Sequence, residues 1–223
     1  MYTRFLISIL FILSFNTSGF SQTPGFRAGI HLGIGEARIT KAGISNQTGK
    51  LSLQGGLAAS YQFTKNIGLV NNILFTTKGS RTSGTETVSG FFGSQQYTYE
   101  EDFSLQYIEI PLMLKVSLGL GSFHLKAFSG PSANFNISGN ADRTYDDPEY
   151  NKDHGFTNKE ITGLNLLEYT LVLGGGIDIE LSDESVLYLE LRESLALNSF
   201  GEINIKDAFN QYITAGIGFL YKY

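Results

Sequence analysis

The stretch from Tyr107 to Ser129, YIEIPLMLKVSLGLGSFHLKAFS, contains two runs of alternating residues separated by a turn-like Gly119-Leu120-Gly121-Ser122. A period of two residues indicates a β-strand, and two such runs joined by a short glycine-rich turn indicate a hairpin. One face of the first run is wholly apolar from Ile108 to Leu118. The opposite face of the hairpin carries the polar side chains Glu109, Lys115, His124 and Lys126. The hairpin is therefore predicted to separate an apolar environment from a polar one.

The same alternation recurs along the chain and predicts eight strands, over residues 26–36, 51–63, 67–77, 107–118, 123–135, 167–181, 186–197 and 211–223. The connections alternate between long (37–50, 80–102, 136–166, 198–210) and short (64–66, 119–122, 182–185). This asymmetry is typical of outer-membrane barrels. We therefore expect an all-β fold: an eight-stranded antiparallel up-and-down transmembrane β-barrel with short periplasmic turns and long extracellular loops.

The N-terminus resembles a secretory signal peptide. Arg4 is followed by an apolar run from Phe5 to Phe15, and small residues at Gly19 and Ser21 suit a cleavage site near Ser21-Gln22. The run is too short to cross a bilayer as a helix. We expect residues 1–22 to be removed and residues 23–223 to form the barrel domain in the cell outer membrane.

Alternation alone leaves two arrangements open, because a secreted soluble lipocalin-like barrel that binds an apolar ligand turns its apolar face inward. Three features favour the membrane barrel, in which the apolar face points outward. The polar face is rich in small residues, the chain ends on an aromatic strand residue, and aromatic residues gather near the turn ends of the apolar faces, as in an interfacial girdle. These aromatic residues are Phe26, Tyr61, Phe63, Phe123, Tyr221 and Tyr223.

Charged residues on the polar faces are candidates for a structural network in the lumen, where opposite charges must pair. The acidic candidates are Glu109, Asp178, Glu180 and Glu190, and the basic ones are Arg27, Lys115, Lys126 and Arg192. Asn71 and Glu193 interrupt otherwise apolar faces, so we expect both off the lipid-facing face, near an interface or at a β-bulge.

Composition narrows the possible functions. A formal charge of −5 argues against a nucleic-acid-binding protein, and the absence of cysteine excludes disulfides, thiolate metal sites and cysteine nucleophiles. The histidines lack metal-ligand spacing, the acidic stretch 142–160 lacks a calcium-loop pattern, and no nucleophile motif is recognisable. We expect no cofactor, no metal and no enzyme activity. A hydrolase at the barrel rim is the less favoured reading.

Several segments resemble the PorT-like outer-membrane β-barrel proteins of Bacteroidetes, above all the Tyr-x-Glu-Ile-Pro-Leu core at 107–112 and Gly130-Pro131. The other similar segments are FRAGIHLGIG, NNILFTTKGS, FHLKAFSGPSANF, LGGGIDIEL and ITAGIGFLYKY. The resemblance implies an outer-membrane barrel, and the family's namesake is associated with protein export across that membrane. We expect a non-enzymatic barrel that acts through its extracellular loops or as an accessory to an envelope or protein-export complex. The partners expected are outer-membrane lipid, the barrel-assembly machinery through the C-terminal strand, and a protein of such a complex.

Overall fold

The computed structural model describes residues 25–41, 47–90, 93–199, 201 and 208–222. The predicted signal peptide, its cleavage site and Tyr223 lie outside these residues.

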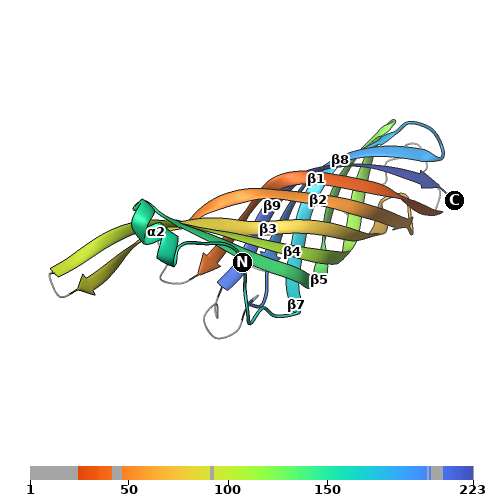
Figure 1. Cartoon of the computed structure of the whole chain (residues 1–223). Helices are drawn as coiled ribbons and strands as arrows, with labels where there is room; N and C mark the ends of the chain where they lie inside the picture. Colours follow the sequence, from red (N-terminus) through yellow and green to blue (C-terminus); the bar gives the residue numbers. More distant parts are fainter. Residues whose placement is uncertain (1–24, 42–46, 91–92, 200, 202–207, 223) are drawn as a thin grey trace, which may run out of the picture.

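Eight long strands close into a barrel (Figure 1). Their order around the ring is β4-β3-β2-β1-β9-β8-β7-β5, and pairing between β4 and β5 completes it. Neighbouring strands are antiparallel, so the predicted eight-stranded up-and-down barrel is confirmed. The strands are β1 (Gly25–Lys41), β2 (Gln47–Gln62), β3 (Ile67–Gly90), β4 (Gly93–Leu120), β5 (Phe123–Tyr145), β7 (Leu167–Glu180), β8 (Ser185–Ala196) and β9 (Ala208–Lys222).

The barrel wall directs its apolar side chains outward. On β1, Ile30 and Leu32 are 56% and 59% exposed, whereas His31 between them is fully buried. A soluble lipocalin-like barrel requires the reverse, so that alternative is wrong. Five of the six aromatic residues assigned to the girdle are exposed at the ends of strands beside the short turns: Phe26, Tyr61, Phe63, Phe123 and Tyr221.

Three of the predicted long loops contain long stretches of strand. The loop predicted over 37–50 is wrong at both ends, because β1 extends to Lys41 and β2 begins at Gln47. β3 and β4 stay paired from Leu74 and Glu109 out to Gly90 and Gly93, so the loop predicted over 80–102 is wrong. The loop predicted over 136–166 is also wrong, because it contains the end of β5, the short helix α2 (Pro148–His154) and β6 (Phe156–Glu160). Ser, Thr and Gly make up about half of residues 80–102, and the alternation of apolar and polar residues disappears beyond the lipid-facing part of the wall.

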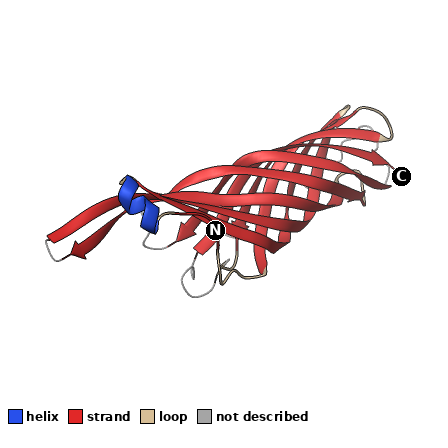
Figure 2. Cartoon of the chain, in the orientation of Figure 1, coloured by secondary structure: helices blue, strands red, loops and turns tan. Residues whose placement is uncertain are grey.

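The extended strands form a second region, which we call the projection. It comprises residues 79–90 of β3, 93–104 of β4 and 138–145 of β5, together with α2 and β6. Figures 1 and 2 show the β3–β4 hairpin reaching well beyond the barrel wall, with α2 at its side. β6 pairs with β5 alone, between Asn140 and Arg143. Within the described part of the chain, no helix has the length and apolar character needed to cross a membrane.

Asn71 and Glu193 both lie on the outward face with the apolar residues, so the expectation that they leave the lipid-facing face is wrong. Asn71 pairs with Ala59 and Leu112 without a register shift, so the expected bulge is wrong. Its side-chain Nδ2 instead donates to the carbonyl oxygen of Pro111 at 3.1 Å, beside a gap in the ladder where proline has no N–H to donate.

Glu193 lies close to the end of β8 opposite the short turns, and accepts a hydrogen bond from Gln211 Nε2 at 2.9 Å. This position agrees with the expectation of an interface.

Candidate functional site

The half of the barrel interior nearest the short turns contains a chain of ion pairs. Lys115 Nζ lies 3.2 Å from Asp178 Oδ2, and Lys126 Nζ lies 2.9 Å from Asp178 Oδ1 and 2.9 Å from Glu190 Oε2. Glu190 Oε1 also pairs with the Arg192 guanidinium at 2.6 Å. All five side chains are buried. Because these residues come from β4, β5, β7 and β8, which are consecutive around the ring, the chain connects half of the wall from inside.

The other predicted lumen charges are arranged differently. Arg27 is buried, but within the described residues no carboxylate lies within ion-pair distance of it. Glu180 is only half-buried, because it is the last residue of β7 and lies beside the turn that follows.

Glu109 is buried among neutral donors rather than beside a lysine. Gln54 Nε2 donates to Glu109 Oε2 at 3.2 Å and Thr76 Oγ1 donates to the same oxygen at 2.9 Å. The Tyr212 hydroxyl donates to Glu109 Oε1. Three hydrogen bonds to a buried carboxylate replace the water that it loses on burial.

Sequence reasoning missed a second buried ion pair. Lys78 Nζ lies 3.0 Å from Glu168 Oε1, and both side chains are fully buried. The ammonium also lies 4.5 Å from the ring centroid of Tyr107 and 4.7 Å from that of Tyr212, and Asn210 Nδ2 donates to Glu168 Oε2 at 2.5 Å. Lys78 stands one residue past the predicted end of the third strand. Continuing the alternation of the polar face beyond Thr76 would have placed it in the lumen.

Aromatic side chains fit inside this narrow barrel because β9 offers glycines. A Cβ atom at Gly216 would lie 2.4 Å from His31 Cε1, and one at Gly218 would lie 2.1 Å from Tyr188 Cζ. The rings therefore rest directly on the β9 backbone. His31 Nδ1 is hydrogen-bonded to the Tyr188 hydroxyl and His31 Nε2 to Gln54 Oε1, each at 3.1 Å.

The interior is thus crossed by charged, amide and aromatic side chains, as expected for a barrel of eight strands. In the described ranges, no three His, Cys, Asp or Glu side chains come together as a possible metal site. The buried contacts join strands across the lumen, as Lys78–Glu168 joins β3 to β7 and Lys115–Asp178 joins β4 to β7.

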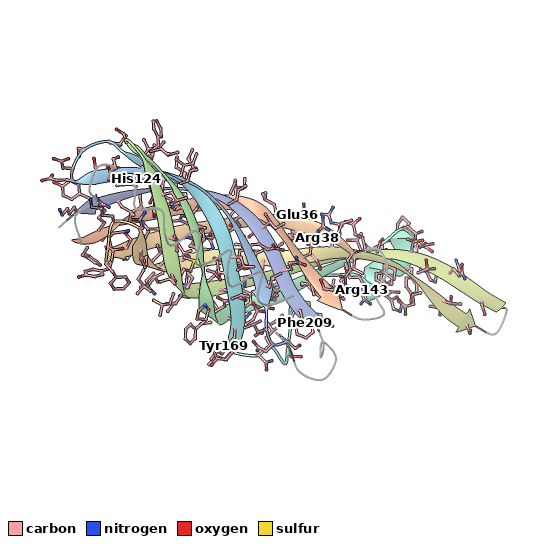
Figure 3. All side chains as sticks on the ribbon, turned by 180° about the vertical axis from the view of Figure 1, so that it is seen from behind. Glu36, Arg38, His124, Arg143, Tyr169 and Phe209 are labelled. Atoms are coloured by element: carbon pink, nitrogen blue, oxygen red, sulfur yellow. The ribbon has the colours of Figure 1, made fainter. Side chains whose placement is uncertain are left out.

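The projection has its own small core on the face continuous with the barrel interior. Arg143 Nη2 donates to Glu101 Oε2 at 3.0 Å, and its guanidinium lies 4.9 Å from the ring centroid of Tyr99. The Tyr145 hydroxyl donates to Glu86 Oε2 at 2.7 Å, which links β5 to β3 across β4. Figure 3 places Arg143 where the barrel passes into the projection.

Helix α2 packs against this small core through one aromatic ring. The Asp147 side chain accepts hydrogen bonds from the N–H groups of Glu149 and Tyr150, which caps the helix at its start. Tyr150 stacks on Tyr97 of β4 at a centroid distance of 3.7 Å and on His154 at 3.9 Å. The helix thereby stabilises the outer part of the β3–β4 hairpin.

The opposite face of the projection is charged and open to solvent. Asp102 pairs with Lys50 of β2 at 2.5 Å and with Arg81 of β3 at 3.0 Å, and Arg81 also pairs with Glu100 at 2.8 Å. Partial burial alone would raise the pKa of Asp102, but hydrogen bonds and ion pairs with Lys50 and Arg81 outweigh burial and lower it. A groove of about 560 Å³ runs over this face, lined in part by Asp102, Asp142 and Asp146.

A family model described as an outer membrane protein beta-barrel domain matches residues 11–202. The chain belongs to this outer-membrane β-barrel family.

Among solved structures, the chain is similar to Neisserial surface protein A, with 12% identity, a TM-score of 0.45, and coverage of 89% of this chain and 97% of that one. It is also similar to OprG from Pseudomonas aeruginosa (14% identity, TM-score 0.45, coverage 92% and 98%). A third is Ail, the attachment invasion locus protein of Yersinia pestis (12% identity, TM-score 0.40, coverage 88% and 99%). No curated protein matches the sequence.

Membership of this family locates the protein in the outer membrane. The outward apolar face of the barrel therefore contacts lipid. The short turns are then periplasmic and the projection is extracellular. At the extracellular end of the wall, polar residues replace apolar ones on the outward face. Figure 3 shows Glu36 and Arg38 of β1 there, where their side chains form an ion pair of 2.7 Å.

Proposed function

We propose that this protein is a PorT-like, non-enzymatic barrel that anchors its extracellular projection in the outer membrane and presents it to a protein of an envelope or export complex. The observation that supports this most strongly is the contrast between a filled interior and extended outer strands. β3 and β4 continue as one paired hairpin far past the wall, and α2 stabilises its outer part.

The internal contacts support an anchoring role rather than transport. Side chains from β4, β5, β7 and β8 are joined in the periplasmic half, and Lys78 and Glu168 are paired in the extracellular half. The same proposal includes insertion by the barrel-assembly machinery through β9, the C-terminal strand, which exposes apolar residues such as Ile213, Ile217 and Phe219 on its outward face.

The test combines surface labelling with cross-linking in intact cells. The chain has no cysteine, so Gln95→Cys in the exposed outer hairpin gives a single thiol for a membrane-impermeant maleimide. Asp183→Cys, in the exposed periplasmic turn after β7, is the matched control. We expect Gln95→Cys to react on intact cells and Asp183→Cys to react only after the outer membrane is permeabilised.

A thiol-reactive cross-linker at the same two positions then tests for a partner. A discrete adduct larger than the barrel from Gln95→Cys supports presentation of the projection to another protein. Equal labelling of both cysteines on intact cells, or no adduct from Gln95→Cys, contradicts the proposal.

A further inference from the structure

Among the described residues, the outer part of β3 is paired along one edge only. β3 pairs with β2 only as far as Thr82, which lies opposite Gln47. From Ser83 to Gly90, β4 is the only strand paired with β3 among the described residues. The corresponding edge of β4 is better covered, because β5 pairs with it up to Tyr99 and Asp146 N–H then donates to the Thr98 carbonyl.

The hydrogen bonds show which backbone groups the free edge presents. In an antiparallel strand, the N–H and C=O of one residue face the same neighbour, and the next residue faces the other way. Because Thr98 faces β5, Tyr97 faces β3, and its partner Glu86 faces β4. The odd-numbered residues of outer β3 therefore direct their N–H and C=O groups to the free edge: Ser83, Thr85, Thr87 and Ser89.

This edge is held in place although it is unpaired. Glu86 accepts a hydrogen bond from the Tyr145 hydroxyl at 2.7 Å, and Tyr97, opposite Glu86, is stacked on Tyr150 of α2. An isolated two-stranded hairpin is only marginally stable in water. Here contacts on one face and on the β4 side support the hairpin, so the β3 edge is preorganised to accept another strand.

The edge also has few of the features that prevent strand addition. Natural edge strands carry lysine, proline, a bulge or a covering element. Between Ser83 and Gly90 there is no lysine or proline, no register shift interrupts the pairing with β4, and Glu86 is the only charged residue. The side chains of Thr85 and Thr87 are exposed on the outer face, where they suit a β-strand surface.

We propose that residues 83–90 bind an extended segment of another polypeptide, which adds to the β3 edge as a further antiparallel strand. This inference rests on the proposed function and names how the projection recognises its partner. Main-chain hydrogen bonds would supply the affinity, as in other cases of strand addition. The segment should carry Thr, Ser or aromatic residues toward Thr85 and Thr87, and no acidic residue next to Glu86.

The membrane argues against a second copy of this chain as the occupant. Two copies in one membrane both direct β3 away from the cell, so their β3 edges run in the same direction. Antiparallel pairing needs strands of opposite direction. A segment that folds back toward the cell surface meets this requirement.

The test uses the full-length protein in detergent micelles and a synthetic probe. The probe is a fluorescent, end-capped octapeptide of alternating threonine and valine with one central lysine, and binding is followed by fluorescence anisotropy. We expect saturable binding to the wild-type protein. The variant Thr85→Pro/Thr87→Pro removes two donors from the free edge without removing any donor to β4, so it should weaken binding about tenfold or more.

Thr85→Val/Thr87→Val is the matched control, because it changes the same side chains and keeps both N–H groups. It should bind within about twofold of wild type. Equal binding by the proline and valine variants, or no saturable binding to the wild type at millimolar peptide, overturns the proposal.

Surface labelling distinguishes failure of the strand-addition proposal from failure of the proposed function. If Gln95→Cys is labelled on intact cells and gives an adduct while the peptide does not bind, only strand addition is wrong. If Gln95→Cys is not labelled on intact cells, the proposed function fails independently of the peptide result.

Discussion

The barrel wall and the projection are built from the same strands but meet different solvents. In the wall, Ile73 and Phe75 of β3 face lipid, and these residues are 49% and 43% exposed. A few residues further along the same face, β3 exposes Arg81 and Ser83 to water. The β3–β4 ladder continues through both regions. Strand pairing can therefore persist where the apolar alternation that usually reveals it has ended.

Ion pairs also differ between the two regions. The Lys78–Glu168 pair in the barrel is fully buried on both sides, whereas the side chains of the Arg81–Glu100 pair in the projection are 54% and 55% exposed. A buried charge that loses its partner is strongly destabilising, while an exposed pair contributes little. The buried pairs of the interior should therefore contribute more to the stability of the protein than the exposed pairs of the projection.

The largest expected effect comes from breaking the buried pair. Lys78→Met leaves Glu168 buried without its cation, so the free energy of unfolding should fall by about 3–5 kcal/mol. The measurement is the urea midpoint of the purified protein folded into lipid vesicles. Lys152→Met makes the same change at an exposed position of α2 and should stay within about 0.5 kcal/mol. Similar losses in both variants would contradict the contrast.

A matched pair of arginine substitutions tests the solvent of each region directly. Leu191 is 63% exposed in the middle of β8, and Val88 is 36% exposed in the projection. Leu191→Arg should cost about 2–4 kcal/mol in a bilayer, because it introduces a charge into the hydrocarbon region. Val88→Arg should cost less than about 0.5 kcal/mol. If Leu191→Arg is equally harmless in vesicles, the outward face does not contact lipid.

The smallest expected effect is a pH dependence of local stability around Asp102 in the projection. The pKa of Asp102 is lowered in the folded protein by its pairs with Lys50 and Arg81. The resulting stabilisation is present above the unfolded value of about 3.9 and is lost as the pH falls through the folded pKa. The protection factor of the Thr82 amide, which is the intrinsic exchange rate at each pH divided by the observed rate, should therefore fall in acid.

In Asp102→Asn, the protection factor of the Thr82 amide should already be lower at neutral pH, with little further change in acid. An acid response at Thr82 that is the same in wild type and in Asp102→Asn would show that these ion pairs do not hold β2, β3 and β4 together.

Sequence reasoning succeeded where each strand has one face toward lipid and the other toward the lumen. The predicted ranges 167–181 and 186–197 agree with β7 and β8 to within one residue at each end, because every second side chain there had to be apolar. It failed over 80–102 because the outer face of that hairpin meets water instead of lipid and carries polar side chains such as Arg81, Thr85 and Glu100. Ser, Thr and Gly in such a segment are equally consistent with a loop.

The sequence by itself determined the wall: eight alternating strands, short turns on one side, and charges gathered on one face. Only the tertiary structure decided which charges meet. Lys78 and Glu168 are 90 residues apart, and their contact depends on the stagger of strands around the closed ring. The tertiary structure also decided that β3 continues beyond its pairing with β2. Its free edge is a consequence of unequal strand lengths, which no local pattern of residues reports.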